Sequence, residues 1–101
     1  MQDLTDKIRT WAIYRELDIA DPNKQVMKLG EEYGEVCAAM AKDQQLESLE
    51  LEIGDMFVVL TILAMQKGTS VERCAALAYE KIKDRKGEMI KGVYVKEDDL
   101  E

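Results

Sequence analysis

Two pairs of carboxylates with the same spacing are the residues of this sequence best suited to chemistry. Glu32 and Glu35 form the first pair, and Glu52 and Asp55 form the second. Residues three apart on a helix share a face, so each pair projects two carboxylates in one direction. If two such helices pack antiparallel, four anions converge, and a hard divalent cation that prefers oxygen ligands is the simplest compensation. The spacing therefore predicts a metal site built from these four carboxylates.

The surroundings of the acids favour this interpretation. Asp55 directly precedes the apolar residues 56–60, so a charge stands at the start of the most apolar segment of the chain. Residues 31–55 include eight acids and one base, which accounts for the whole net charge of −7. Such an excess of carboxylate repels itself unless a cation offsets it, and it argues against a nucleic-acid partner. Each pair also encloses a glycine, Gly34 or Gly54, which would let a helix or a ligand approach closely.

The same acids also suit two other functions. Solvated carboxylates on amphipathic helices would make a non-enzymatic helical interaction module, whose acidic face docks a basic partner. Saturable Mg²⁺ or Mn²⁺ binding separates this alternative from a metal enzyme, because a docking face binds cations only weakly. A metal-dependent hydrolase of another phosphate ester is a third possibility, and its products would distinguish it.

Composition excludes several classes of site. The sequence holds no histidine, which removes Ser-His-Asp and Cys-His catalysis, histidine-containing zinc sites and Glu-x-x-His di-iron bundles. Cys37 and Cys74 lie among alanines, and we expect them to be buried and reduced. The first residues show no basic start followed by an apolar stretch, so we expect no signal peptide. The longest apolar stretch, residues 53–65, is too short to cross a membrane. We therefore expect a cytoplasmic protein without a membrane span.

Helices must position the acids, and the sequence predicts four of them. With 101 residues, the chain is expected to form a single domain of the all-α class, a compact four-helix bundle with at most one short strand. Apolar periodicity predicts helices over about 4–17, 22–40 and 46–66, and a fourth from a capping box at 69–72 to about 89. The third is apolar nearly all round, which marks it as the central element.

Local signals set the ends of these helices. Asp21 and Pro22 supply an N-cap and a first helical residue for the second helix. Gly68 is a typical C-terminal glycine for the third. Residues 41–45 are the expected turn between these two helices, and residues from about 90 to 101 are expected to form a flexible acidic tail.

Two segments carry a family resemblance, KLGEEYGE at residues 28–35 and EIGD at residues 52–55, which an apolar run follows. They resemble the MazG-type nucleotide pyrophosphohydrolases of the all-α NTP pyrophosphatase superfamily. The hallmark of that family is Glu-x-x-Glu, a variable gap and then Glu-x-x-Asp. The likeness covers the chain from about Trp11 to Arg85.

The resemblance implies an all-α enzyme that hydrolyses ribo- or deoxyribonucleoside triphosphates to the monophosphate and pyrophosphate. It implies that the four acids hold Mg²⁺, for which Mn²⁺ can substitute. Members assemble as homodimers or homotetramers with active sites near subunit interfaces, and many are housekeeping enzymes of the nucleotide pool. Base and sugar preference, the number of metal ions and the physiological role stay open.

Further residues are candidates for the reaction itself. Glu31, beside the motif, either accepts a proton from the attacking water or faces solvent. The resemblance places a lysine and an arginine of the last helix near the phosphates, which correspond here to Lys81 and Arg85. Family members often have asparagine where this chain has Asp84. A solvated basic face is the alternative for this helix.

The nucleoside has three candidate contacts. Trp11 is the only tryptophan, and its ring either stacks on a nucleobase or belongs to the core. Arg15 and Lys28 could add positive charge near the ribose or the phosphates.

Overall fold

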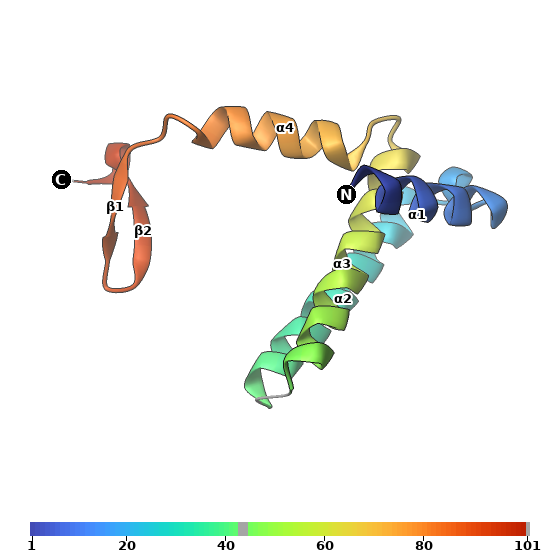
Figure 1. Ribbon diagram of the computed structural model, residues 1–101, viewed down its shortest axis with the longest axis horizontal. Coiled ribbons are helices and arrows are strands. Elements are labelled where there is room, and N and C mark those ends of the chain that lie inside the picture. The colour runs from blue at the N-terminus through green and yellow to red at the C-terminus, as the bar shows by residue number, and fades with distance from the viewer. Residues whose placement is uncertain (43–44, 101) are drawn as a thin grey trace. The chain divides into compact units, whose positions relative to one another are not determined.

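The computed structural model describes residues 1–42 and 45–100, and the chain divides into two units. The first unit is Met1–Val71, and the second begins at Glu72. Four α-helices, two short 3-10 helices and one two-stranded hairpin make up the described chain (Figure 1). The predicted all-α class is confirmed, but the expectation of at most one short strand is wrong, because the chain forms a hairpin of two strands.

The first helix is shorter than its apolar pattern predicts. Helix α1 spans Gln2–Tyr14, and a 3-10 helix, η1, follows at Leu17–Ile19. The prediction that the helix continues to residue 17 is wrong, because Glu16 adopts a left-handed conformation with φ 60° and breaks the helical backbone. The side-chain amide of Gln66 donates to the carbonyl of Leu17 at 2.9 Å, which ties η1 to the third helix.

The second and third helices form the arm that carries the acids. Helix α2 spans Pro22–Ala41, and the side chain of Asp21 accepts from the N–H of Asn23 at 3.0 Å, which confirms the predicted N-cap. Helix α3 spans Leu46–Gln66, as predicted. The two helices lie side by side and run in opposite directions (Figure 1). The predicted turn over 41–45 lies partly outside the described residues.

Helix α3 ends in the way that its glycine predicts. Gly68 has φ +78°, the left-handed conformation that glycine adopts at little cost. Its N–H donates to the carbonyl of Met65 at 3.0 Å, and the N–H of Thr69 donates to that of Ala64 at 2.9 Å. These two bonds make a Schellman motif, which satisfies carbonyls at the end of the helix.

Helix α3 is the central element of the first unit, as predicted, because it contacts α1, η1 and α2. The side-chain amide of Gln25 on α2 donates to the carbonyl of Val59 on α3 at 3.2 Å. Few apolar side chains of the described residues are buried, and most of these are small. They are Ala12, Ala39, Val59, Ile62 and Ala64. Neither Cys37 nor Cys74 joins this core; both are free and exposed, so their predicted burial is wrong.

The second unit differs most from the sequence-based prediction. Helix α4 spans Val71–Ile82, so the predicted helix to about residue 89 is wrong. Strand β1, Gly87–Ile90, pairs antiparallel with strand β2, Val93–Lys96, and Gly87 lies opposite Lys96. Lys91 and Gly92 both have positive φ, as a two-residue type I′ hairpin turn requires. The turn chemistry therefore outweighs the helical tendency of this segment.

A short 3-10 helix, η2, Glu97–Asp99, follows β2. The single domain over residues 1–101 and the flexible tail from about residue 90 stay predictions. No helix among the described residues is long and apolar enough to span a membrane.

Candidate metal centre and substrate residues

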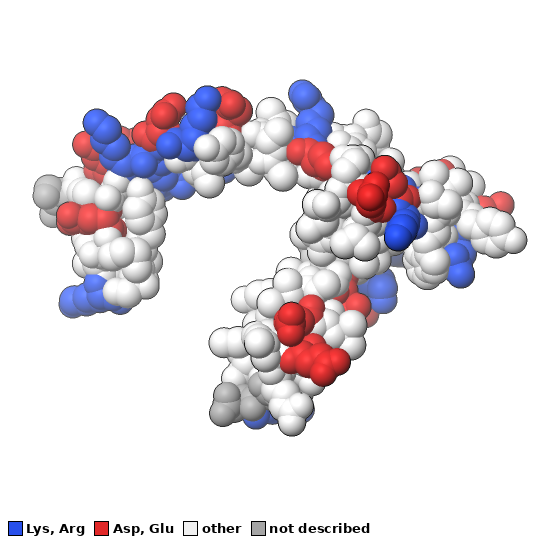
Figure 2. Space-filling model, viewed as in Figure 1, with Lys and Arg blue, Asp and Glu red and all other residues white. Residues whose placement is uncertain are grey.

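The four predicted metal ligands converge on one point between α2 and α3. Each of Glu32, Glu35, Glu52 and Asp55 offers a carboxylate oxygen, and these four atoms all lie within 4.8 Å of one another. The spacing of three residues turns each pair to one side of its helix, and the antiparallel packing of the two helices brings the pairs face to face. Acidic side chains are visible over this arm in the space-filling view (Figure 2).

The cluster is partly withdrawn from water. Glu32 is only 9% exposed, Glu52 and Asp55 are half-buried, and Glu35 is exposed. One oxygen each of Glu32 and Glu52, the Oε2 atom, is buried without a hydrogen-bond partner. A buried, unpaired carboxylate oxygen costs free energy that an ordinary surface acid does not incur. These two orphaned oxygens therefore point to a ligand that the acids are arranged to hold.

The charges within the cluster disfavour the ionised state. Burial raises the pKa of Glu32, and the negative charges of Glu35 and Asp55 raise it further. Lys28 opposes this shift, because its ammonium lies 3.7 Å from the Glu32 carboxylate. Hydrogen bonding with Glu52, together with the charge of that residue, raises the pKa of Glu35. A cation placed among the four acids would relieve this repulsion.

The donor set fits a divalent cation of the magnesium class. All four donors are carboxylate oxygens, the ligand type that Mg²⁺ and Mn²⁺ prefer. Mg²⁺ is usually held by a few carboxylates, with water and substrate phosphates completing its shell, and such a site needs one open side. Glu35 is the exposed member of the cluster, and Glu32 is its most buried member.

The two glycines between the paired acids leave space unfilled. A Cβ built on Gly34 or on Gly54 would meet no atom within 4 Å. Packing of α2 against α3 therefore does not require glycine at either position. The predicted close approach of these two helices does not explain why glycine is present there. The space beside each acid pair stays accessible to another molecule.

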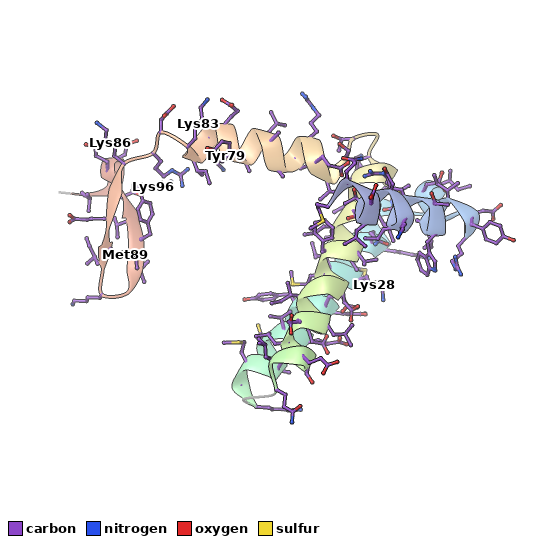
Figure 3. All side chains as sticks on the ribbon, viewed as in Figure 1. Lys28, Tyr79, Lys83, Lys86, Met89 and Lys96 are labelled. Carbon is purple, nitrogen blue, oxygen red and sulfur yellow. The ribbon has the colours of Figure 1, made fainter. Side chains whose placement is uncertain are left out.

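The predicted nucleoside contacts lie on the first unit. The guanidinium of Arg15 lies 4.3 Å from the centre of the Trp11 ring and donates to the Trp11 carbonyl at 3.1 Å. Trp11 is 46% exposed, so it is not a core residue, and it lines a cavity of about 370 Å³ with Leu4 and Val58. Lys28 extends from the arm of α2 and α3 (Figure 3). It is exposed, and its ammonium forms an ion pair with Glu32 at 3.7 Å. Glu31 is exposed on α2 next to the first acid pair.

The predicted phosphate contacts, Lys81 and Arg85, belong to the second unit. Both line a cavity of about 350 Å³. Lys86, which directly follows Arg85, and Lys96 line the same cavity, although neither was predicted as a phosphate contact. The signal for Lys96 was the pair Lys91-Gly92, a turn that folds β2 back on β1 and so returns Lys96 to the start of the hairpin.

Comparison with known proteins agrees with the arrangement of the acids. The family model described as the MazG nucleotide pyrophosphohydrolase domain matches residues 21–90. A curated relative, described as an uncharacterized 18.2 kDa protein in the rep-hol intergenic region of Haemophilus phage HP1 (strain HP1c1), is 43% identical over 67 residues. The match covers 65% of this chain and 40% of the relative. No solved structure matches significantly.

The matched region contains all four clustered acids, together with Lys81 and Arg85. Trp11 and Arg15 precede it.

Proposed function

Because this chain belongs to the MazG nucleotide pyrophosphohydrolase family, we propose that it hydrolyses ribo- or deoxyribonucleoside triphosphates to the monophosphate and pyrophosphate. One observation carries the proposal beyond family membership. Four carboxylates from two helices come within 4.8 Å of one another, and two of their buried oxygens have no partner. An interaction module with a solvated acidic face would have no reason to bury these oxygens.

Glu32, Glu35, Glu52 and Asp55 would hold the cation, Mg²⁺ or Mn²⁺. When bound, the metal neutralises triphosphate charge, polarises the attacked phosphorus and lowers the pKa of a bound water. In the hydrolysis, a water oxygen bonds to the α-phosphorus, the bridging bond to the β-phosphate breaks, and pyrophosphate leaves. The water also loses a proton, and we assign its acceptance to Glu31, which is exposed beside the acid pair on α2.

The remaining roles follow from charge and shape. Lys81 and Arg85 would bind phosphate oxygens, since a triphosphate needs protein cations besides the metal. Trp11 would stack on the base with the ring face that Arg15 does not cover. Lys28, already paired with Glu32, would add positive charge between the nucleoside and the acids.

We also propose that the working form is a homodimer or a homotetramer. The described residues bury few apolar side chains, whereas Leu51 is 65% exposed and Ile53 is 53% exposed. Both line a largely apolar cavity of about 640 Å³ with Leu4 and Phe57. Apolar surface of this kind is typical of protein interfaces, and a second copy that covered it would stabilise the small core. A role in housekeeping of the nucleotide pool is consistent with this assembly and reaction.

A product analysis tests the function directly. Purified protein is incubated with ribo- and deoxyribonucleoside triphosphates in Mg²⁺, in Mn²⁺ and in EDTA, and the products are separated by ion exchange. Metal-dependent formation of monophosphate and pyrophosphate in equal amounts supports the proposal. Release of inorganic phosphate would indicate another phosphohydrolase. Absence of turnover with every nucleotide would favour the interaction module.

A further inference from the structure

The cavity in the second unit brings together four cations, three from residues 81–86 and one from the end of β2. Lys81, near the end of α4, and Arg85, just beyond it, supply two of them. Lys86, directly before β1, and Lys96, at the end of β2, supply the other two. Arg85 is half-buried, which limits the freedom of its side chain. The cavity of about 350 Å³ equals the liquid volume of roughly a dozen waters, ample for two linked phosphates.

Backbone contacts hold the two hairpin lysines at the same end of the hairpin. Lys96 lies opposite Gly87 in the strand register, so it is next to the residue that follows Lys86. The N–H of Glu97 donates to the carbonyl of Lys86 at 2.6 Å, which ties the strand ends together. Figure 3 shows Lys86 and Lys96 at this end, whereas Met89 lies farther along the hairpin.

Gly87 is needed for this close approach. A Cβ at Gly87 would lie 2.2 Å from the Val95 carbonyl oxygen and 2.7 Å from the Tyr94 hydroxyl oxygen. Neither distance is compatible with a side chain, so glycine at this position lets β2 pair closely with β1 next to Lys86 and Lys96.

The cationic side chains of the cavity are available to bind an anion. Within residues 1–42 and 45–100, none of the four cations forms an ion pair, although Lys83 nearby pairs with Glu80 at 2.9 Å. Asp84, Glu97 and Asp98 also line the cavity, which leaves an excess of one positive charge. Like charges held close together repel, and a polyvalent anion offsets that repulsion. The small excess suits an anion that must also leave.

We propose that Lys86 and Lys96 of the hairpin complete, with Lys81 and Arg85, a pocket for the pyrophosphate group, which is both the β,γ-diphosphate part of the substrate and the released product. This inference rests on the proposed function for the identity of its ligand. It adds Lys86 and Lys96 to the residues that are proposed to bind phosphate.

Binding of inorganic pyrophosphate to the full chain in EDTA tests the pocket by itself, because without metal the acid cluster repels the anion. Isothermal titration of the wild type should give saturable binding. Lys86→Gln and Lys96→Gln should each weaken it about five- to tenfold, the effect of losing one charge-assisted contact. Lys96→Arg should restore most of the affinity, and circular dichroism should show that each variant keeps its fold.

Two controls separate a pocket from overall charge. Lys83→Gln removes a nearby lysine that does not line the cavity, and Lys91→Asn removes the turn lysine while keeping a residue that tolerates positive φ. Equal weakening by these variants and by Lys96→Gln would overturn the proposal, as would absence of pyrophosphate binding to the wild type.

Turnover then distinguishes failure of the pocket from failure of the proposed function. If nucleoside triphosphates are hydrolysed but Lys96→Gln changes neither KM nor inhibition by pyrophosphate, the pocket is wrong and the function stands. If no nucleotide is hydrolysed but pyrophosphate binding depends on Lys86 and Lys96, the function is wrong and the pocket stands.

Discussion

At the scale of single residues, the molecule concentrates its unfavourable electrostatics at one place. Glu32 and Glu35 both have raised pKa values, and buried oxygens of Glu32 and Glu52 lack hydrogen-bond partners. These features disfavour the metal-free fold, and binding of a cation would offset them. The proposed function and the stability of the fold therefore make opposite demands on the same side chains.

Neutralising one carboxylate of the acid cluster should have opposite effects on turnover and on the stability of the metal-free fold. Glu35→Gln or Asp55→Asn should lower metal-dependent turnover by about a hundredfold or more, since each removes a charge that the reaction uses. In EDTA, the same variants should unfold at equal or higher urea concentration than the wild type, because one repulsion is gone. Steady-state kinetics and urea titration measure the two effects. Glu47→Gln, on α3 outside the cluster, is the control and should change neither.

The proposed role of Glu31 as the proton acceptor is tested by a separate variant. Glu31→Gln should lower kcat by about a hundredfold while leaving the affinity for Mn²⁺ nearly unchanged, because Glu31 is outside the ligand set. Paramagnetic titration with Mn²⁺ and kinetics on the same preparation give the comparison. Normal kcat in this variant would return Glu31 to solvent.

The raised pKa values predict how the metal-free protein responds to pH. Glu32 and Glu35 bind a proton more tightly when folded than at their ordinary pKa of 4.5, so their contribution to stability is fully present below pH 4.5. It is lost as the pH rises through the folded pKa values. Asp6 acts in the opposite direction, because a hydrogen bond from Arg9 lowers its pKa.

Urea unfolding in EDTA across the acidic and neutral range, for the wild type and Glu35→Gln, isolates the cluster from such other groups. The wild type should lose more stability than the variant as the pH rises. Parallel curves would mean that Glu35 does not carry the effect.

At the scale of elements, local signals predicted most helices because each signal acts through bonds to nearby backbone. Asp21 as N-cap and Gly68 as C-terminal glycine mark the start of α2 and the end of α3 in the structure as in the sequence. The convergence of the four acids was predictable for the same reason, since helical spacing and an antiparallel pair suffice to bring the acids together. The left-handed Glu16 and the end of α4 at Ile82 were not, because turn conformations there override apolar periodicity.

Two glycine substitutions should therefore have opposite effects. Gly68→Ala forces a side chain into a conformation with φ +78° and should destabilise the fold by about 1 kcal/mol. Gly30→Ala lies inside α2, where a Cβ meets nothing within 4 Å, and should stabilise it by about 0.5 to 1 kcal/mol. Thermal unfolding of both variants at one protein concentration gives the comparison; a gain from Gly68→Ala would contradict the role of the Schellman motif.

At the scale of the whole molecule, many large apolar side chains of the described residues are exposed. Sequence periodicity predicted apolar stripes but could not say whether another element or another copy covers each stripe, because both remove the same area from water. The two exposed cysteines are an example. Their alanine neighbours favour burial, but they do not show whether an element of the same chain or another copy would cover the cysteines.

Charging the exposed apolar surface should change the assembly. Leu51→Glu should weaken self-association at least about tenfold, because Leu51 lines the apolar cavity of the first unit and is 65% exposed. Sedimentation equilibrium over a range of concentrations measures the change. Lys24→Glu, on the exposed surface of α2, is the matched control. A wild type that stays monomeric at every concentration would contradict the proposed oligomer.

The pairing of Trp11 with Arg15 also gives the protein a built-in optical signal. Trp11 is the only tryptophan of the chain, it is partly exposed, and a guanidinium lies against its ring. The tryptophan fluorescence of the protein therefore reports on the surroundings of Trp11 alone. If a nucleobase stacks there, titration with a nucleotide should quench the emission without any label, and the same titration with inorganic pyrophosphate should leave it unchanged. Base recognition and phosphate recognition would then be separable in a single cuvette.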